Sequence, residues 1–189
     1  MLSDLRQRKV ARVLFDEFHG EAWTIRPEVA RRMHPGHPQD ASYAAAASHL
    51  AARDFEVAAA ADGPLTEEVL AATDVLVIAQ PSQSRWEHTV SENPPVFSVD
   101  ELRAIEGFVS RGGGLVVLAE AEVDKYGSNL NGVLKPFGVR VENTTVRDYT
   151  GNGSGPTWVA GEGSPPSGAG SSALLHLVHR TRFYRAGSL

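Results

Sequence analysis

Five apolar stretches alternate with polar or helix-forming stretches along the first 150 residues of the chain. Four of them, at 10–15, 55–60, 74–79 and 115–120, are short and rich in aliphatic residues, and they predict strands. The stretch DVLVIA at 74–79 is apolar throughout, which is typical of a strand buried on both faces of a parallel sheet. A fifth strand is predicted at about 139–145 from the β-propensity of VRVENTTV.

Helix signals separate these strands. The alanine-rich segment 40–53 predicts a helix, with Asp40 as its N-cap and an apolar face on one side. A shorter helix is expected within 64–73, where Thr66 is the cap and two leucines form a hydrophobic staple. The residues of these apolar pairs and faces are Tyr43, Ala47 and Leu50 in the first helix and Leu65 and Leu70 in the second.

The third and fourth helices have clear ends. Ser98 and Glu101 form the S-x-x-E pattern of a capping box, so a helix is predicted from there to Ser110, where glycines follow. A short helix is expected at 128–137, ending at Gly138. The residues expected on the buried face of the longer helix are Val99, Leu102, Ile105 and Val109.

Alternating strands and helices of this length predict an α/β fold of the flavodoxin-like, doubly wound kind. We expect a mainly parallel sheet in the order 2-1-3-4-5 with helices on both faces. This domain covers 1–150. The Gly/Ser/Pro-rich segment 151–172 predicts a flexible connection, and 173–189 is strand-like without an obvious closing element, so the chain is interpreted as possibly truncated.

Composition narrows the function classes. A net charge of −5 argues against a nucleic-acid-binding surface, and no run approaches the roughly 18 apolar residues that span a bilayer. The chain has no cysteine, which excludes disulfides, a thiol nucleophile and thiolate metal ligands. No secretory signal is visible at the amino terminus, so a cytoplasmic location is the default expectation. The sequence leaves oligomeric state open.

Polar residues gather where the predicted strands end. The loop 16–39 begins with four titratable residues, and the loop 80–97 carries Trp and His beside hydrogen-bonding side chains. Because ligands bind at the carboxyl edge of open α/β sheets, these loops are the candidate site. The candidate ligand-contacting residues are Asp16, Glu17, His19, Glu21, Gln80, Ser82, Trp86, His88, Glu120 and Asn129.

Each cluster has two interpretations. The group after the first strand suits acid–base chemistry or a divalent metal, but it also suits capping of the next turn and pairing with arginines. The group at 80–88 suits a sugar, nucleotide or peptide, or else a surface lid packed through Trp86. No catalytic residue and no cofactor is assigned, and a divalent metal is the less favoured interpretation.

The progression DVLVIAQP, FSVDELRAIEGFVSRGGGLVVLAE and NLNGVLKPFGVRV resembles the class I glutamine-amidotransferase-like superfamily. It is most similar to the non-catalytic DUF4350 and GIFT-domain branch. The corresponding motifs are the acidic-His segment 16–21, the helix and glycine turn 101–113, and 134–139. These motifs are mostly structural, so the resemblance implies the fold more strongly than any activity.

The sequence departs from the catalytic members of that superfamily. They carry a cysteine on the turn after the strand equivalent to LVVLA, where this chain has Glu120 or Ala121. Glutaminase chemistry by that route is therefore excluded. The resemblance implies a non-catalytic domain that binds a small molecule, a sugar or a protein, as a module of a larger protein. The alternative is a hydrolase or other small-molecule enzyme that uses Asp16, Glu17 and His19, with or without a divalent metal.

Overall fold

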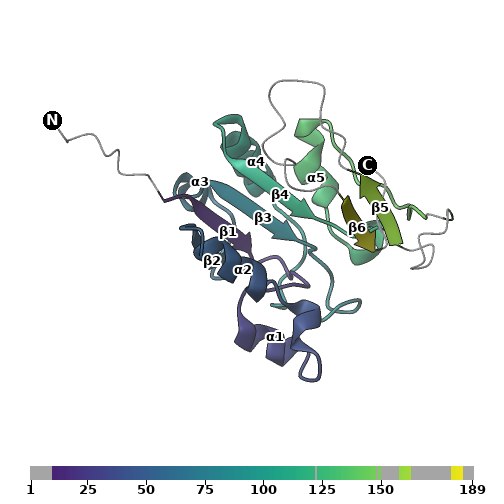
Figure 1. The fold of residues 1–189 in the computed structure, drawn as a ribbon. Coiled ribbons are helices and arrows are strands. Elements are labelled where there is room, and N and C mark those ends of the chain that lie inside the picture. The colour runs from purple at the N-terminus through teal and green to yellow at the C-terminus, as the bar shows by residue number, and fades with distance from the viewer. Residues whose placement is uncertain (1–9, 122, 148, 150–157, 163–179, 185–189) are drawn as a thin grey trace. The chain divides into compact units, whose positions relative to one another are not determined.

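The computed structural model describes residues 10–121, 123–147, 149, 158–162 and 180–184 of the 189-residue chain. The protein is α/β, and its main sheet consists of four parallel strands in the order β2-β1-β3-β4 (Figure 1). Each lies within two residues of a strand predicted from the sequence. The strands are β1 (Arg12–Asp16), β2 (Glu56–Ala60), β3 (Val75–Ala79) and β4 (Gly114–Leu118).

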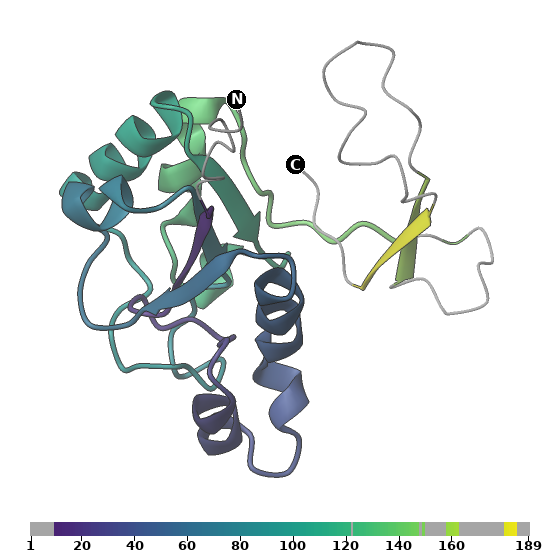
Figure 2. The same ribbon diagram turned by 60° about the vertical axis from the view of Figure 1, so that its left-hand side comes forward.

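Helices cover both faces of this sheet. Helix α2 (Ala44–Ala51) joins β1 to β2 on one face, whereas α3 (Glu67–Ala71) and α4 (Val99–Ser110) lie on the other (Figure 2). The strand order reverses between β1 and β3, which places the connections on opposite faces because such crossovers are right-handed. Helix α5 (Leu130–Leu134) contacts α4, and the short turn η3 (Lys135–Phe137) follows it.

The core lies against the two central strands. Val13, Phe15 and Val77 form a cluster on the α2 face, with Tyr43 and Leu50 packed against it. The alternate side chains of the same strands point to the opposite face and are at most 3% exposed. They are Leu14, Leu76 and Ile78. Burial on both faces explains the continuous apolar pattern of these strands.

The predicted fifth strand is wrong. Residues 139–147 form no strand, so the main sheet ends at β4 among the described residues. Val139 and Val146 are each more than a third exposed, and the residues between them are largely polar. Val141 is the one buried residue of 139–147, so this segment has no continuous buried face, and propensity alone does not make a strand.

Two further strands form a separate small sheet. Strand β5 (Trp158–Glu162) pairs antiparallel with β6 (Arg180–Tyr184). β5 falls inside 151–172, for which a flexible connection was predicted, and the rest of that segment lies outside the described residues. β6 falls inside the strand-like segment 173–189. The chain divides into two compact units, Met1–Ala119 with Asp124–Arg140, and Glu120–Val123 with Val141–Leu189.

The first long loop contains a helix that the sequence analysis missed. Helix α1 (Pro27–Met33) begins with a proline, has Glu28 in its first turn and has arginines in its last turn. All three features are ordinary helix signals. Its buried residues Val29 and Met33 pack with Ala41 and Val90, which ties this segment to the loop after β3.

Two details of the other helices also differ. Asp40 lies in the short turn η1 (Pro38–Ala41), and α2 begins only at Ala44, whose backbone N–H is accepted by the Ser42 hydroxyl. In α4 the capping box and the end at Ser110 are confirmed, but the buried face is rotated. Of the predicted face only Ile105 is fully buried; the buried set is Glu101, Ala104, Ile105 and Phe108.

Two other predicted helix ends are confirmed, although α3 ends at Ala71 instead of Thr73 and α5 begins at Leu130 instead of Ser128. Thr66 accepts the backbone N–H of Val69 at the start of α3, and Gly138 adopts the left-handed conformation that ends η3. None of the helices in the described part of the chain is long and apolar enough to cross a membrane.

Candidate functional site

Strand β1 delivers four titratable residues to the carboxyl edge of the sheet. Asp16 is its last residue, and Glu17, His19 and Glu21 follow in the loop. All four are buried, with at most 1% of each residue exposed. The location of this cluster is the one expected for a site in an α/β sheet. Its near-complete burial is a feature that the sequence analysis did not anticipate.

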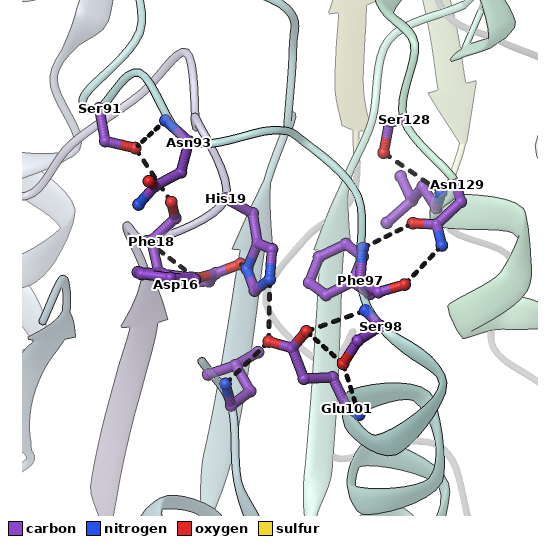
Figure 3. A network of polar contacts seen from close by, with 12 residues as sticks. Asp16, Phe18, His19, Ser91, Asn93, Phe97, Ser98, Glu101, Ser128 and Asn129 are labelled. Carbon is purple, nitrogen blue, oxygen red and sulfur yellow. Dashed lines mark hydrogen bonds and ion pairs between the residues drawn. The ribbon is translucent and has the colours of Figure 1, made fainter. Parts of the chain in front are cut away.

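His19 is held between two carboxylates. Its Nδ1 lies 2.8 Å from Oδ2 of Asp16, and its Nε2 lies 2.9 Å from Oε1 of Glu101 (Figure 3). The second contact has the distance of an ion pair, although its angle is not that of a straight hydrogen bond. The other oxygen of Asp16 accepts the backbone N–H of Phe18, which fixes the turn that carries the imidazole.

Glu101 reaches this cluster from the first turn of α4. Its Oε2 accepts the backbone N–H and the hydroxyl of Ser98, and its Oε1 accepts the backbone N–H of Leu65 at 3.0 Å. One carboxylate therefore caps α4, holds the segment before α3 and contacts His19. These contacts also explain why the buried face of α4 includes Glu101.

The imidazole packs between aromatic rings. The ring of Phe97 lies 4.2 Å from that of His19, and the ring of Phe18 meets it edge-on at 5.2 Å. Asn129 forms two hydrogen bonds with the backbone of Phe97: its Oδ1 accepts the N–H, and its Nδ2 donates to the carbonyl (Figure 3). Asn129 thus positions the ring that covers His19.

These surroundings favour a charged imidazole. Burial opposes the charged form, but the hydrogen bond and charge of Asp16 and the charge of Glu101 outweigh it and raise the pKa of His19. Burial likewise opposes ionisation of Glu101, but the N–H groups of Ser98 and Leu65 and the charge of His19 lower its pKa. The contacts of His19 therefore favour its protonated form over the neutral one.

Glu17 has a structural set of partners. Its Oε1 accepts from the Thr24 hydroxyl and from the backbone N–H of Ile25, both at 2.8 Å. Its Oε2 accepts from Nε of Arg26 at 2.7 Å. The carboxylate organises the turn that leads into α1. This agrees with the interpretation of capping and arginine pairing for Glu17.

The two loops at the sheet edge are joined through their backbones. Ser82 donates to the carbonyl of Gly20, Ala22 donates to that of Gln80, and Val90 donates to that of Glu21. Gln80 is buried and has a positive φ of 59°, an uncommon conformation for a residue with a side chain. The hydroxyl of Ser82 is also buried and donates to the carbonyl of Gln83.

Gly20 makes this close approach feasible. Its φ is +63°, and a Cβ at this position would lie 2.7 Å from the carbonyl oxygen of Asn93 and 3.1 Å from that of Ser82. Both contacts are with backbone atoms, which cannot move aside as a flexible side chain can. The position therefore requires glycine for two reasons, conformation and space.

We expect Gly20→Ala to lower the free energy of unfolding by about 2 kcal/mol, the sum of left-handed strain and local overpacking. Gly138→Ala is the matched control, because its φ is +71° but nothing lies within 4 Å of its added Cβ. It should lose only about 1 kcal/mol. Urea unfolding followed by circular dichroism measures both, and equal losses would contradict the close approach.

The remaining candidate residues do not join the buried cluster. Trp86 is 47% exposed and His88 is also exposed, both on the loop after β3. Arg85 and Lys125 lie 5.4 and 5.3 Å from the centre of the Trp86 ring. Glu120 follows β4 and belongs to the second compact unit.

Among the described residues, no group of three or more His, Cys, Asp or Glu side chains is arranged to hold a metal ion. In the loop after β1, the side chains of His19 and Glu17 already have protein partners. His19 contacts a carboxylate through each ring nitrogen, and Glu17 accepts three hydrogen bonds.

Sequence reasoning missed Glu101 and Phe97 as members of this cluster. Glu101 was recognised only as part of a capping box, and Phe97 only as the end of a polar loop. One signal for both was available. A helix that follows a parallel strand begins at the carboxyl edge, so the first turn of α4 and the end of β1 share that edge.

No protein-family model matches this chain, and no curated protein gives a significant match to it.

Proposed function

We propose that this chain is a non-catalytic binding domain. The observation that supports this proposal is the burial of His19 and its contacts. His19 is 1% exposed, and each of its ring nitrogens lies within 2.9 Å of a carboxylate. A general base or acid must reach a proton of the substrate. With Asp16 and Glu101 on either side, this imidazole joins the loop after β1 to helix α4.

We further propose that the domain is a cysteine-free relative of the amidotransferase-like superfamily, with a flavodoxin-like fold. The parallel order β2-β1-β3-β4 and the capped helix followed by a glycine turn support this relation. The absence of cysteine from the sequence supports a non-catalytic member. A likeness of fold does not define an activity, so the binding role rests on the site.

The surface proposed for binding is the loop after β3. Trp86 is half exposed there, with Arg85 and Lys125 near its ring. A backbone hydrogen bond anchors this turn, because Gln83 donates its N–H to the carbonyl of Tyr126. An exposed aromatic ring on a fixed turn suits a small molecule, a sugar or a protein as the partner.

The first test is for catalysis. We expect the wild-type protein and His19→Asn to hydrolyse p-nitrophenyl acetate and p-nitrophenyl phosphate at the same background rate. Turnover at least tenfold above background that disappears in the variant would overturn the proposal. Metal analysis of the same preparations provides a second criterion, since stoichiometric zinc, manganese or magnesium that is lost in His19→Ala would also overturn it.

The second test is for binding. A ligand at 100 times its dissociation constant stabilises the folded state by about 2.7 kcal/mol, which raises the Tm of a domain of this size by roughly 5–10 °C. A screen of sugars, nucleotides and acidic or basic peptides should give such a shift in the wild type. The shift should be lost in Trp86→Ala, and a shift that Trp86→Ala leaves unchanged would place the binding surface elsewhere.

One observation favours the alternative of an enzyme. Clusters of titratable groups with perturbed pKa values mark active sites, and both Glu21 and His19 have raised pKa values at the carboxyl edge of the sheet. Structural ion-pair networks produce the same signal. The hydrolysis assay with His19→Asn separates these two interpretations.

A further inference from the structure

Glu21 is the one buried carboxyl of the cluster without an assigned role. Its residue is 0% exposed, and among the described residues neither of its carboxyl oxygens has a hydrogen-bond partner of good geometry. Its backbone carbonyl, in contrast, accepts the N–H of Val90, and the residue forms an isolated bridge with Pro81. The backbone contacts thus hold residue 21 at the junction of the two loops, with its carboxyl buried.

The surroundings of this carboxyl are acidic. The groups that act on it most strongly are Asp16 and Glu17 from the end of β1, and β3 contributes the backbone of Ala79. The two cations nearby have other partners, because His19 contacts Asp16 and Glu101, and Arg26 contacts Glu17. An ionised Glu21 would thus be a buried anion next to two others.

We propose that Glu21 carries a proton at neutral pH and shares it with Asp16, so that this carboxyl pair is a proton-binding site that locks together the loops after β1 and β3. In this arrangement Asp16 accepts the hydrogen bond from Glu21 and also contacts Nδ1 of His19 at 2.8 Å. When Glu21 ionises, it releases one proton to solvent and leaves two like charges facing each other. The inference does not depend on the proposed binding role.

Three observations support this protonation state. An ionised carboxyl at this depth is disfavoured, and burial is the largest cause of the raised pKa of Glu21, followed by the charge of Asp16, while the backbone of Ala79 acts in the opposite direction. A protonated carboxyl has a donor to offer, which Asp16 can accept with the capacity left beside His19 and Phe18. Sharing a proton between two adjacent carboxyls is the usual resolution of such a pair.

The stability that this carboxyl pair gives to the contact between the two loops depends on pH. Because the pKa of Glu21 is raised in the folded state from its usual value of 4.5, its contribution to stability is complete below about pH 4.5 and declines as the pH rises toward its folded value. Above that value the buried charge favours opening of the contacts around Glu21. Those contacts include the Val90–Glu21 and Ala22–Gln80 hydrogen bonds between the two loops.

The direct test is the infrared spectrum at pH 7. A protonated buried carboxyl gives a C=O stretching band that ionised carboxylates lack, and we expect this band in the wild type. It should be absent in Glu21→Gln and retained in Glu28→Gln, which changes an exposed glutamate of α1. A wild-type spectrum without the band, or a band that survives in Glu21→Gln, would overturn the proposal.

The second test is stability against pH. Glutamine resembles the protonated carboxyl but cannot ionise, so Glu21→Gln should be at least as stable as the wild type at pH 5. Its advantage should grow as the pH rises to 8. Hydrogen exchange at Val90 and Ala22, corrected for the intrinsic rate, should accelerate with pH only in the wild type. A variant that is less stable than the wild type at pH 8 would contradict the proton site.

Discussion

Replacing His19 with leucine should lower the free energy of unfolding at pH 6 by about 3–5 kcal/mol, the usual loss when one partner of a buried ion pair is removed. The leucine keeps an apolar side chain against Phe97 but leaves Asp16 and Glu101 without the cation between them. Both carboxylates are buried, so water cannot replace the imidazole. Urea unfolding at fixed pH measures this difference.

The pH dependence makes the prediction specific. The pKa of His19 is raised above 6.5 in the folded state, so its contribution is complete below about pH 6.5 and is lost as the pH rises through the folded value. The pKa of Glu101 is lowered below 4.5, so its part is lost as the pH falls through that lower value. The difference between wild type and variant should therefore be largest between these limits.

The control is His49→Leu, which changes an exposed imidazole in the last turn of α2. Surface substitutions of this kind usually change stability by less than about 0.5 kcal/mol. A loss below about 1 kcal/mol for His19→Leu, or one that does not vary with pH, would show that the imidazole is neutral in the folded protein.

The parts of the fold that follow from local chemistry were predictable. The strand at 74–79 contains a continuous apolar run, and such a run predicts a strand buried on both faces of a sheet, as β3 is. Ser98, Thr66 and Gly138 define helix ends through their own side chains or conformations, so no distant residue is needed to recognise them.

The parts that failed depend on what a segment packs against. The buried face of α4 was misplaced because apolarity was the criterion, whereas Glu101 is drawn inward by His19 and by the N–H of Leu65. The strand predicted at 139–145 was wrong for the opposite reason. Its pattern of apolar and polar residues is a local property, and it does not indicate a neighbouring strand with which the segment could pair. Tertiary contacts decided both outcomes.

In the candidate site, too, some features follow from the local sequence and others depend on tertiary packing. That Asp16 and His19 lie at the sheet edge follows from their position after an apolar strand. That both are buried, and that His19 contacts a glutamate 82 positions further along, depends on how α4 packs on the sheet. Acidic and imidazole side chains at a strand end thus indicate a place in the fold, and their partners determine whether they remain free for chemistry.

Removal of the Glu17 carboxylate should have an effect of comparable size for a different reason. We expect Glu17→Ala to lower the free energy of unfolding by about 4 kcal/mol, because hydrogen bonds to a charged group contribute more than neutral ones and three donors lose their acceptor together. Those donors are Thr24, Ile25 and Arg26. Glu28→Ala, at an exposed position of α1, should change stability by less than about 0.5 kcal/mol.

Glu17→Gln separates the contributions of the two oxygens. An amide oxygen placed at Oε1 still accepts from Thr24 and Ile25, whereas the amide nitrogen at Oε2 faces the donor Nε of Arg26. The loss should therefore be about half that of Glu17→Ala, and Arg26→Ala should add little to it, because both changes remove the same contact. A loss in Glu17→Gln as large as in Glu17→Ala would mean that the charge of Glu17, and not its two hydrogen bonds to the turn, holds the start of α1. Equal stability of Glu17→Gln and wild type would mean that Arg26, which is part-exposed, contributes through its hydrocarbon stem alone.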